Sequence, residues 1–453
     1  MKAGQLAMTQ GSLLDKLFLF ALPLAASGIL QLLFNTADVA VVGRFAGKTA
    51  LAAVGCTTHI INLLVNLFVG LSVGANVVLA DCLGRERYEE APAIVQTVMA
   101  MALISGFGLL AVGQVVIRPI LVLVSTPEEV IDLSELYLRL YFLGMPFIMG
   151  YNFGAAVLRS KGDTRRPLFC LTVSGILNVL LNLLLVIVFQ LSVAGVAIAT
   201  LAANLVSFGM VVWFLTHEQG PLHFDPRHMK INAIYAKRIL KVGVPAGLQS
   251  MVFSLANVCI QSGINSFGEN CVAGSSAANN FESFVYMTIN AFGQAAVTFS
   301  SQNYGARKYD RCRRVVVLAL LSSTAIAGVL SWTFLLGRGL FIQIYTPDPV
   351  VMAFGMERMV HALRFQLLMP LFEVTGGSLR GIGHSALPAA VTIFGTCVLR
   401  LVWRYTVFIR WPQFGLLLDA YPVSWLTTGI LMLAIWFWVA RPALSSVTAP
   451  SDT

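Results

Sequence analysis

The stretch 158–167, LRSKGDTRRP, recurs 221 positions later as 379–388, LRGIGHSALP. A chance resemblance would not repeat elsewhere at nearly the same spacing, yet further landmarks do so. They are Leu22–Pro23 with Val244–Pro245, Asn35 with Asn257, GRERY at 84–88 with GARKY at 305–309, and STPEEV at 125–130 with YTPDPV at 345–350. The sequence therefore predicts two similar halves that run in the same internal direction.

Composition indicates where these halves reside. Of the 453 residues, 57% are hydrophobic and only 11% are charged, and the mean hydropathy is +0.79. Soluble domains carry roughly 25% charged residues, so this chain cannot keep a water-facing surface. The net charge of +9 comes from basic residues that punctuate apolar runs. That distribution is typical of membrane topology and not of nucleic-acid binding.

Twelve apolar runs predict an all-α polytopic membrane protein with twelve transmembrane helices, since one span needs ~20 apolar residues. The halves then form two six-helix bundles related by a pseudo-twofold axis along the membrane normal, an architecture typical of transporters. We expect an N-terminal bundle at 1–216, a cytoplasmic connecting loop at 217–240, a C-terminal bundle at 241–441 and a cytoplasmic tail at 442–453. The runs fall at 16–42, 49–80, 92–118, 132–158, 167–190, 192–216, 240–267, 270–302, 313–340, 353–379, 386–410 and 414–440.

Lysine and arginine set the predicted orientation. If the N-terminus lies inside, 20 of the 30 basic residues fall on the inner side, from Lys2 to Arg441. Positive residues concentrate in cytoplasmic loops. We therefore expect a multi-pass membrane protein with both termini in the cytoplasm.

Polar residues inside the first span share one helical face. Gln31, Asn35 and Asp38 stand at i, i+4 and i+7, a spacing that aligns side chains along a helix. Pro23 precedes them and removes a backbone hydrogen bond, which predicts a bend. An acid at membrane depth is costly and marks a functional candidate.

Two further pairs at i, i+4 lie in the fifth and sixth predicted spans. They are Asn178 with Asn182, and Thr200 with Asn204. Together with Asp38 they predict a carboxylate surrounded by neutral oxygens, which suits a hard cation or a proton. For any single Asn or Thr, the alternative is a helix-packing hydrogen bond.

The second half carries Asn257, Gln261 and Asn265 at helical spacing, with no acid among them. Glu282 and Glu373 are its acids at membrane depth, and each could meet a cationic substrate or pair with an arginine such as Arg364. Two further arginines stand one turn apart in the eleventh span, and for them we expect snorkelling or helix-end anchoring. They are Arg400 and Arg404.

No motif indicates an enzyme, a metal site or a bound cofactor. The chain has no phosphate loop of the type GxxxxGK[ST], no HExxH and no GxSxG. Its seven cysteines show no metal-ligand spacing. We expect no cofactor beyond a coupling ion, Na⁺ or H⁺.

The first-span stretch LPLAASGILQLLFNTADVAVVGRFAG, at 22–47, and the paired turns LRSKGDTRRP and SLRGIGHSALP resemble the multidrug and toxic compound extrusion (MATE) family. The resemblance covers essentially the whole chain and is nearest to the bacterial NorM/DinF-like branch. It implies an inner-membrane antiporter that expels organic, often cationic, drugs or toxic metabolites in exchange for Na⁺ or H⁺. The partners implied are small-molecule substrates and the bilayer, with no nucleic acid, and the protein is expected to be a monomer.

The resemblance also assigns residues. Asp38 matches the family's first-span acid, Pro23 the proline of its bend, Asn178 a fifth-span asparagine and Thr200 a sixth-span hydroxyl. Where many relatives have a second acid, this chain has Asn182. Phe253 and Met369 stand where NorM-type members place acids in the C-terminal bundle, so the N-terminal bundle should carry ion coupling.

We therefore expect alternating access between two bundles, with ion coupling at Asp38, Asn178, Asn182 and Thr200 and a substrate cavity near Asn204, Asn257, Gln261 and Glu282. One alternative is a lipid-linked glycan flippase of the same superfamily, which should line its cavity with cationic residues. An alternative of a different class is an ion channel or a membrane-embedded enzyme. A pseudo-twofold monomer offers no symmetric filter for the former, and no acid/base pair was found for the latter.

Overall fold

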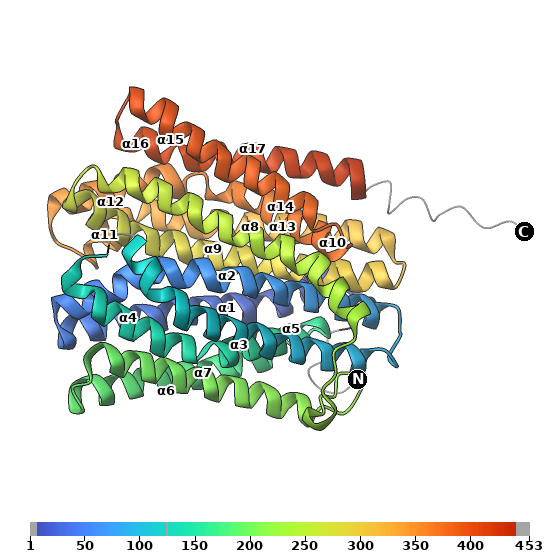
Figure 1. Cartoon of the computed structure of the whole chain (residues 1–453). Helices are drawn as coiled ribbons and strands as arrows, with labels where there is room; N and C mark the ends of the chain where they lie inside the picture. The colour runs from blue at the N-terminus through green and yellow to red at the C-terminus, as the bar shows by residue number, and fades with distance from the viewer. Residues whose placement is uncertain (1–6, 124–125, 441–453) are drawn as a thin grey trace, which may run out of the picture. The chain divides into compact units, whose positions relative to one another are not determined.

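The computed structural model describes residues 7–123 and 126–440. Lys2, Arg441 and the predicted tail at 442–453 lie outside these described residues. Within the described ranges every regular element is a helix, as the composition predicts (Figure 1).

The described chain divides into two compact units. Unit 1 comprises Ala26–Gly247, and unit 2 comprises Ala7–Ala25 together with the chain from Leu248 onward. These boundaries differ from the predicted 1–216 and 241–441. The leading part of the first helix belongs to the second unit, and the connecting loop with the start of the next helix belongs to the first.

The described part of unit 1 is built from six complete α-helices and parts of two others, with short π-helical segments, η1 and η2, that continue two of them. Its elements are the end of α1 (Leu13–Val41), η1 (Val42–Ala46), α2 (Lys48–Gly84), α3 (Ala91–Leu123), α4 (Glu128–Leu143), α5 (Met145–Ser160), α6 (Arg165–Leu183), η2 (Leu184–Val188), α7 (Ser192–Thr216), the 3₁₀ turn η3 (Pro226–His228) and the start of α8 (Ala233–Asn265).

The core of unit 1 lies between α2, α3 and α5, where α5 packs against both neighbours. Phe142 and Phe153 are fully buried there with Ile94 and Met99. α6 and α7 pack side by side (Figure 1). This antiparallel pair brings the polar residues of the fifth and sixth predicted spans onto neighbouring helices.

The start of α8 packs on α2 with the two backbones almost in contact. A Cβ at Gly70 would lie 2.2 Å from Gly247 Cα, and one at Gly74 would lie 2.3 Å from the Ile239 carbonyl oxygen. Small residues allow helices this close approach in membranes. Glycine at these positions therefore fixes the start of α8 to unit 1.

Unit 2 is centred on a long helix, α9, which packs against α10, α12 and α13. Its elements are the start of α1, the rest of α8, α9 (Glu269–Gly305), α10 (Tyr309–Leu336), α11 (Arg338–Gln343), α12 (Pro349–Leu363), the 3₁₀ turn η4 (Gln366–Leu368), α13 (Met369–Gly381), α14 (Ala386–Thr392), the π-helical η5 (Ile393–Val398), α15 (Leu399–Arg410), α16 (Phe414–Leu418), α17 (Ala420–Ile435) and the π-helical η6 (Trp436–Ala440).

The start of α1 is anchored to unit 2 by aromatic contacts and by its leading segment. The rings of Phe18 and Phe292 meet edge to face at 5.5 Å, and those of Phe20 and Phe299 at 5.6 Å. Arg311 Nη2 donates to the Gln10 carbonyl at 2.9 Å. Each unit therefore holds the beginning of a helix whose end belongs to the other.

By length and apolar composition, nine of the described helices can cross a membrane, or ten if α4 and α5 form one span bent by 46°. The two other predicted spans are also helical. α9 has the length but carries a run of polar residues from Ser275 to Ser283, and α12 and α13 are separate short helices joined by η4. All twelve predicted runs therefore coincide with helix.

Candidate functional site

Asp38 lies at one end of a chain of hydrogen-bonded side chains in unit 1. Asn182 Nδ2 donates to Asp38 Oδ1 and to Asn178 Oδ1, the latter at 3.1 Å. Asn178 Nδ2 donates in turn to Thr200 Oγ1 at 3.3 Å. The structure thus brings together the four residues that the sequence predicted for ion coupling.

Three helices position this network. Asp38 lies on α1, Asn178 and Asn182 lie one turn apart on α6, and Thr200 lies on α7. η1 begins four residues after Asp38, and η2 begins two residues after Asn182. A π-helical turn interrupts the regular i to i−4 hydrogen bonds and often marks functional sites. The two key helices are therefore irregular directly beyond their polar residues.

The network is buried at its centre, partly exposed at both ends and rich in oxygen. Asn178 and Asn182 are buried, at 5% and 1% exposure. Asn182 Oδ1 has no hydrogen-bond partner among the described residues. Carboxylate, amide and hydroxyl oxygens are the ligands that hard cations prefer. The arrangement can hold a cation or a proton on Asp38, although no cluster of three His, Cys, Asp or Glu side chains that could bind a metal occurs among the residues described.

Two tyrosines on α4 adjoin this centre and were not predicted. Tyr137 is buried in one cluster with Val41 of α1 and Val186 of η2. Tyr141 packs against this cluster, and its ring centroid lies 6.0 Å from that of Tyr137. Their i, i+4 spacing inside a predicted span was a signal for them in the sequence. This spacing alone does not distinguish them, because tyrosine is common in apolar helices.

Other predicted residues of unit 1 stand outside the network. Gln31 and Asn35 are exposed on α1, and no hydrogen bond joins them to Asp38 in the part of the chain that the structure describes. Asn204 follows Thr200 by one turn on α7, and its backbone carbonyl accepts from Ser207 Oγ at 3.0 Å. Pro23 lies inside α1, two residues before the last residue of α1 that belongs to unit 2.

Comparison with known proteins identifies the family. The sequence model of the MatE family matches residues 23–184 and again 245–406, so both halves match separately and both matches begin at a proline. This chain belongs to the MATE family.

Relatives agree with the match. The chain is 27% identical over 438 residues to "Probable multidrug resistance protein YoeA" of Bacillus subtilis, covering 95% of this chain and 90% of that protein. It is 27% identical over 301 residues to "FAD transporter" of Shewanella oneidensis, covering 65% of this chain and 66% of that protein. A solved structure of a multidrug resistance MATE family transporter in an outward-facing conformation covers 98% of this chain and 99% of its own, with a TM-score of 0.89 at 22% identity.

The MATE chain is thus a multi-pass membrane transporter with the twelve-helix fold, and not an enzyme. Its relatives include bacterial proteins named as probable multidrug resistance proteins, which indicates a bacterial inner membrane and small-molecule substrates.

Unit 2 of this MATE protein has its own polar centre. Arg358 on α12 forms an ion pair with Glu282 on α9 at 2.7 Å and also donates to Ser275 Oγ at 2.7 Å. Glu282 therefore pairs with an arginine, as one alternative stated, but the partner is Arg358. Arg364, the example named above, lies instead over the ring of the adjacent Phe365.

Glu373 on α13 is buried at 8% exposure. Its Oε1 accepts from Asn290 Nδ2 at 3.4 Å, so its described hydrogen bond comes from an amide. Gln261 on α8 donates to Asn265 Oδ1 at 3.0 Å. That hydrogen bond stays within one helix and does not join another.

The prediction for Arg400 was wrong. Its side chain does not snorkel or anchor a helix end, because it is fully buried at 0% exposure. It donates from Nε to Ser424 Oγ at 3.0 Å and from Nη1 to Asn257 Oδ1 at 2.7 Å. Helix periodicity places a residue on a face but does not show which face turns inward. Arg404 is only partly buried and lies over the Phe408 ring at 4.5 Å.

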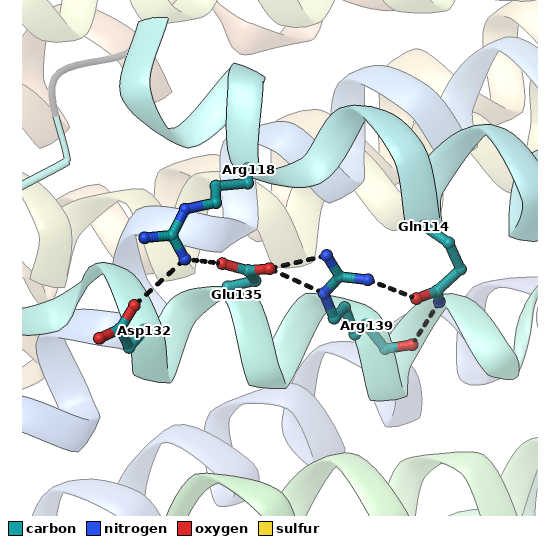
Figure 2. A network of polar contacts seen from close by, with 5 residues as sticks. All are labelled: Gln114, Arg118, Asp132, Glu135 and Arg139. Carbon is teal, nitrogen blue, oxygen red and sulfur yellow. Dashed lines mark hydrogen bonds and ion pairs between the residues drawn. The ribbon is translucent and has the colours of Figure 1, made fainter.

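A third polar cluster joins α3 to α4. Figure 2 shows Glu135 between two arginines, 2.5 Å from Arg118 and 2.7 Å from Arg139. Arg118 also reaches Asp132, and Arg139 exchanges hydrogen bonds with Gln114. Exposed ion pairs of this kind contribute little individually, but together they fix the register of α3 against α4, the helix that carries both tyrosines beside Asp38.

Proposed function

We propose that this MATE protein is a secondary antiporter that exports organic compounds in exchange for Na⁺ or H⁺ by alternating access. The observation that carries this proposal is the network from Asp38 through Asn182 and Asn178 to Thr200, a partly desolvated carboxylate within reach of neutral oxygens. A ligand shifts a conformational equilibrium only by its differential affinity for the two states. The ion and the substrate must therefore favour different states of the protein.

The chain of contacts explains how ion binding at Asp38 is felt by three helices. Asn182 donates a hydrogen bond to the Asp38 carboxylate. A cation or proton on the carboxylate weakens that hydrogen bond and frees the amide to turn its oxygen toward the ion. Since Asn182 also holds Asn178, and Asn178 holds Thr200, the change passes from α1 to α6 and α7.

The experiment is substrate export by inverted membrane vesicles under a sodium or a proton gradient, each collapsed separately. Asp38→Asn should lose the acceleration that the effective gradient gives to wild-type protein. Asp15→Asn is the matched control, because Asp15 is an exposed acid in the first turn of the same helix. Gradient-driven export that survives in Asp38→Asn at the wild-type rate would contradict the coupling role.

The substrate panel should include organic anions as well as cations. The relatives include both multidrug resistance proteins and an FAD transporter. Their names therefore do not share one sign of substrate charge. A cationic dye, a neutral compound and a flavin nucleotide measured in the same vesicles would assign the class.

The lipid-linked glycan flippase remains the alternative transporter function. Such a flippase should line its cavity with cationic residues, and Arg358 and Arg400 are buried inside unit 2. The match of both halves to the MatE family favours the exporter. Export of a soluble compound from lipid-defined vesicles distinguishes the two functions directly.

We further propose a cytoplasmic location for both termini and a monomeric state, as the basic residues and the repeat indicate.

A further inference from the structure

Three arginines in the described part of unit 2 are buried, Arg358, Arg380 and Arg400, and the surroundings of Arg358 and Arg400 differ in charge. Arg358 donates from Nε and Nη2 to both carboxylate oxygens of Glu282, at 2.7 and 2.9 Å. It also donates to Ser275 and to Asn279, at 2.7 and 2.9 Å. Its charge is neutralised and every guanidinium nitrogen has a partner.

Arg400 has no such compensation. Its partners, Asn257 and Ser424, are neutral, and its Nη2 atom is buried without a hydrogen-bond partner among the described residues. No carboxylate of the described chain lies within ion-pair distance of Arg400. Glu282 pairs with Arg358 instead. Buried charges at membrane depth are normally paired or mark a pathway for a charged ligand. Arg400 is thus a buried cation in need of an anion.

The helices around Arg400 repeat those around Asp38. Arg400 lies on α15, Asn257 on α8 and Ser424 on α17, which correspond to the fifth, first and sixth spans of the first half. Asn257 stands 222 positions after Asn35, and Arg400 stands 222 positions after Asn178. Both units therefore build a polar centre from equivalent helices, but the charged group is a carboxylate in unit 1 and a guanidinium in unit 2.

Two aromatic rings lie beside the Arg400 guanidinium, and their faces attract a cation. The Arg400 guanidinium lies 4.6 Å from the centroid of the Tyr421 ring and 5.3 Å from that of Phe253. The half-exposed Asn257 covers it on the α8 side. One turn farther along α15, Arg404 adds a second unneutralised charge, and its buried Nε has no partner among the described residues.

We propose that unit 2 binds an anionic group, a carboxylate or a phosphate, on Arg400. The anion accepts from Nη2 and, once Asn257 turns away, from Nη1, the two-point geometry that guanidinium groups offer to carboxylates and phosphates. The proposal names a substrate class for the exporter proposed above and so rests on that function. It predicts that the transported compound, or one end of it, is negatively charged.

The test is binding to the purified full-length protein in neutral detergent, with flavin mononucleotide and riboflavin as probes. The two share one ring system and differ by a single phosphate. Flavin mononucleotide should bind and raise the thermal midpoint, while riboflavin should bind much more weakly. Arg400→Gln should weaken flavin mononucleotide binding by about tenfold or more, since a charge-assisted two-point contact is lost.

Arg410→Gln is the matched control, because Arg410 is an exposed arginine on the same helix. It should bind as wild type. Since a buried arginine can be needed for folding, Asn257→Asp gives a second route. This nearly isosteric change places a carboxylate on Arg400, neutralises it internally and should abolish anion binding while it raises the thermal midpoint of the ligand-free protein.

Short-chain phosphatidic acid, compared with short-chain phosphatidylcholine, separates a lipid headgroup from a soluble anion. Binding of either anionic probe that depends on Arg400 supports the proposal and identifies the source. If neither binds, or if binding is unchanged in both Arg400→Gln and Asn257→Asp, the proposal is overturned. The assay contains no ion gradient, so failure of the proposed antiport would not alter its result.

Discussion

Asp38 and Asn182 should contribute unequally to the proposed ion site, because only Asp38 can carry charge. Asp38 is the acid on which a cation or proton would reside, whereas Asn182 supplies an amide that hydrogen-bonds to it. In a membrane, loss of a charged ligand abolishes ion binding, whereas loss of a neutral ligand only weakens ion binding. The two positions therefore give graded variants of the same site.

Asn182→Ala should keep gradient-driven export but require a higher ion concentration for half-maximal rate, by about tenfold, as expected for loss of one hydrogen bond or ligand. The measurement is the export rate in vesicles as a function of the coupling ion. Asn62→Ala is the control, because Asn62 is an exposed asparagine of α2 with no predicted role in the site. An ion dependence in Asn182→Ala as completely lost as in Asp38→Asn would contradict the unequal roles.

Glu218, just beyond α7, gives a second prediction at this scale. Lys161 Nζ and Arg166 Nη1 lie 2.7 and 2.6 Å from its carboxylate. Burial alone would raise the pKa of Glu218, but hydrogen bonds and charges from these two bases outweigh it and hold the pKa below the ordinary value of 4.5. A depressed native pKa means that this carboxylate stabilises the fold above pH 4.5 and ceases to do so as the pH falls through the native value.

Glu218→Gln should therefore lower the thermal midpoint at pH 7 and converge on wild type as the pH falls below about 4.5, since glutamine cannot titrate. Thermal unfolding of both proteins in detergent at pH 7, 5, 4 and 3 gives the difference at each pH. A difference that stays constant, or grows toward low pH, would refute the assignment.

At the scale of elements, sequence predicts helices well and their breaks less well. The run at 132–158 was expected as one span, but the chain forms α4 and α5, which meet at Gly144 with a bend of 46°. Pro146 follows at the start of α5, where its missing N–H favours a helix beginning. Hydropathy registers neither this break nor the π-helical segments, because both keep the chain apolar.

In the polar centres, too, some contacts were predictable from the sequence and others were not. The group around Asp38 was predictable because i, i+4 spacing on three spans encodes it locally. The pairing of Arg358 with Glu282, and of Arg400 with Asn257, joins residues 76 and 143 positions apart. It depends on how each helix is rotated in its bundle, which a single sequence with mixed polar and apolar faces does not define.

Packing of the α8 start on α2 gives the prediction at this scale. Gly70→Leu adds a side chain where even a Cβ would lie 2.2 Å from Gly247 Cα, so the helices must separate. Overpacking of this kind costs about 1–3 kcal/mol or more. The thermal midpoint should fall, whereas Gly209→Leu, where the added Cβ meets nothing within 4 Å, should be tolerated.

Across the whole molecule, the prediction concerns orientation. With both termini inside, a protease-cleavable tag placed after Thr453 should be cut in inverted vesicles and protected in right-side-out vesicles or spheroplasts. A tag inserted at residue 219, in the connecting loop, should behave in the same way. Cleavage of either tag from the outer side would show that the positive-inside interpretation is wrong.

α1 and α8 each begin in one unit and end in the other. This has a consequence for whether one half could fold alone. Each half begins with a helix whose first turns complete the other half, through Phe18 and Phe20 in one case and Gly243 and Gly247 in the other. A single repeat expressed alone would lack one packed segment and expose another. Two identical copies would satisfy each other by trading their leading segments, which is a domain-swapped dimer. The duplicated chain provides both leading segments within one molecule, so each half is completed without a second copy.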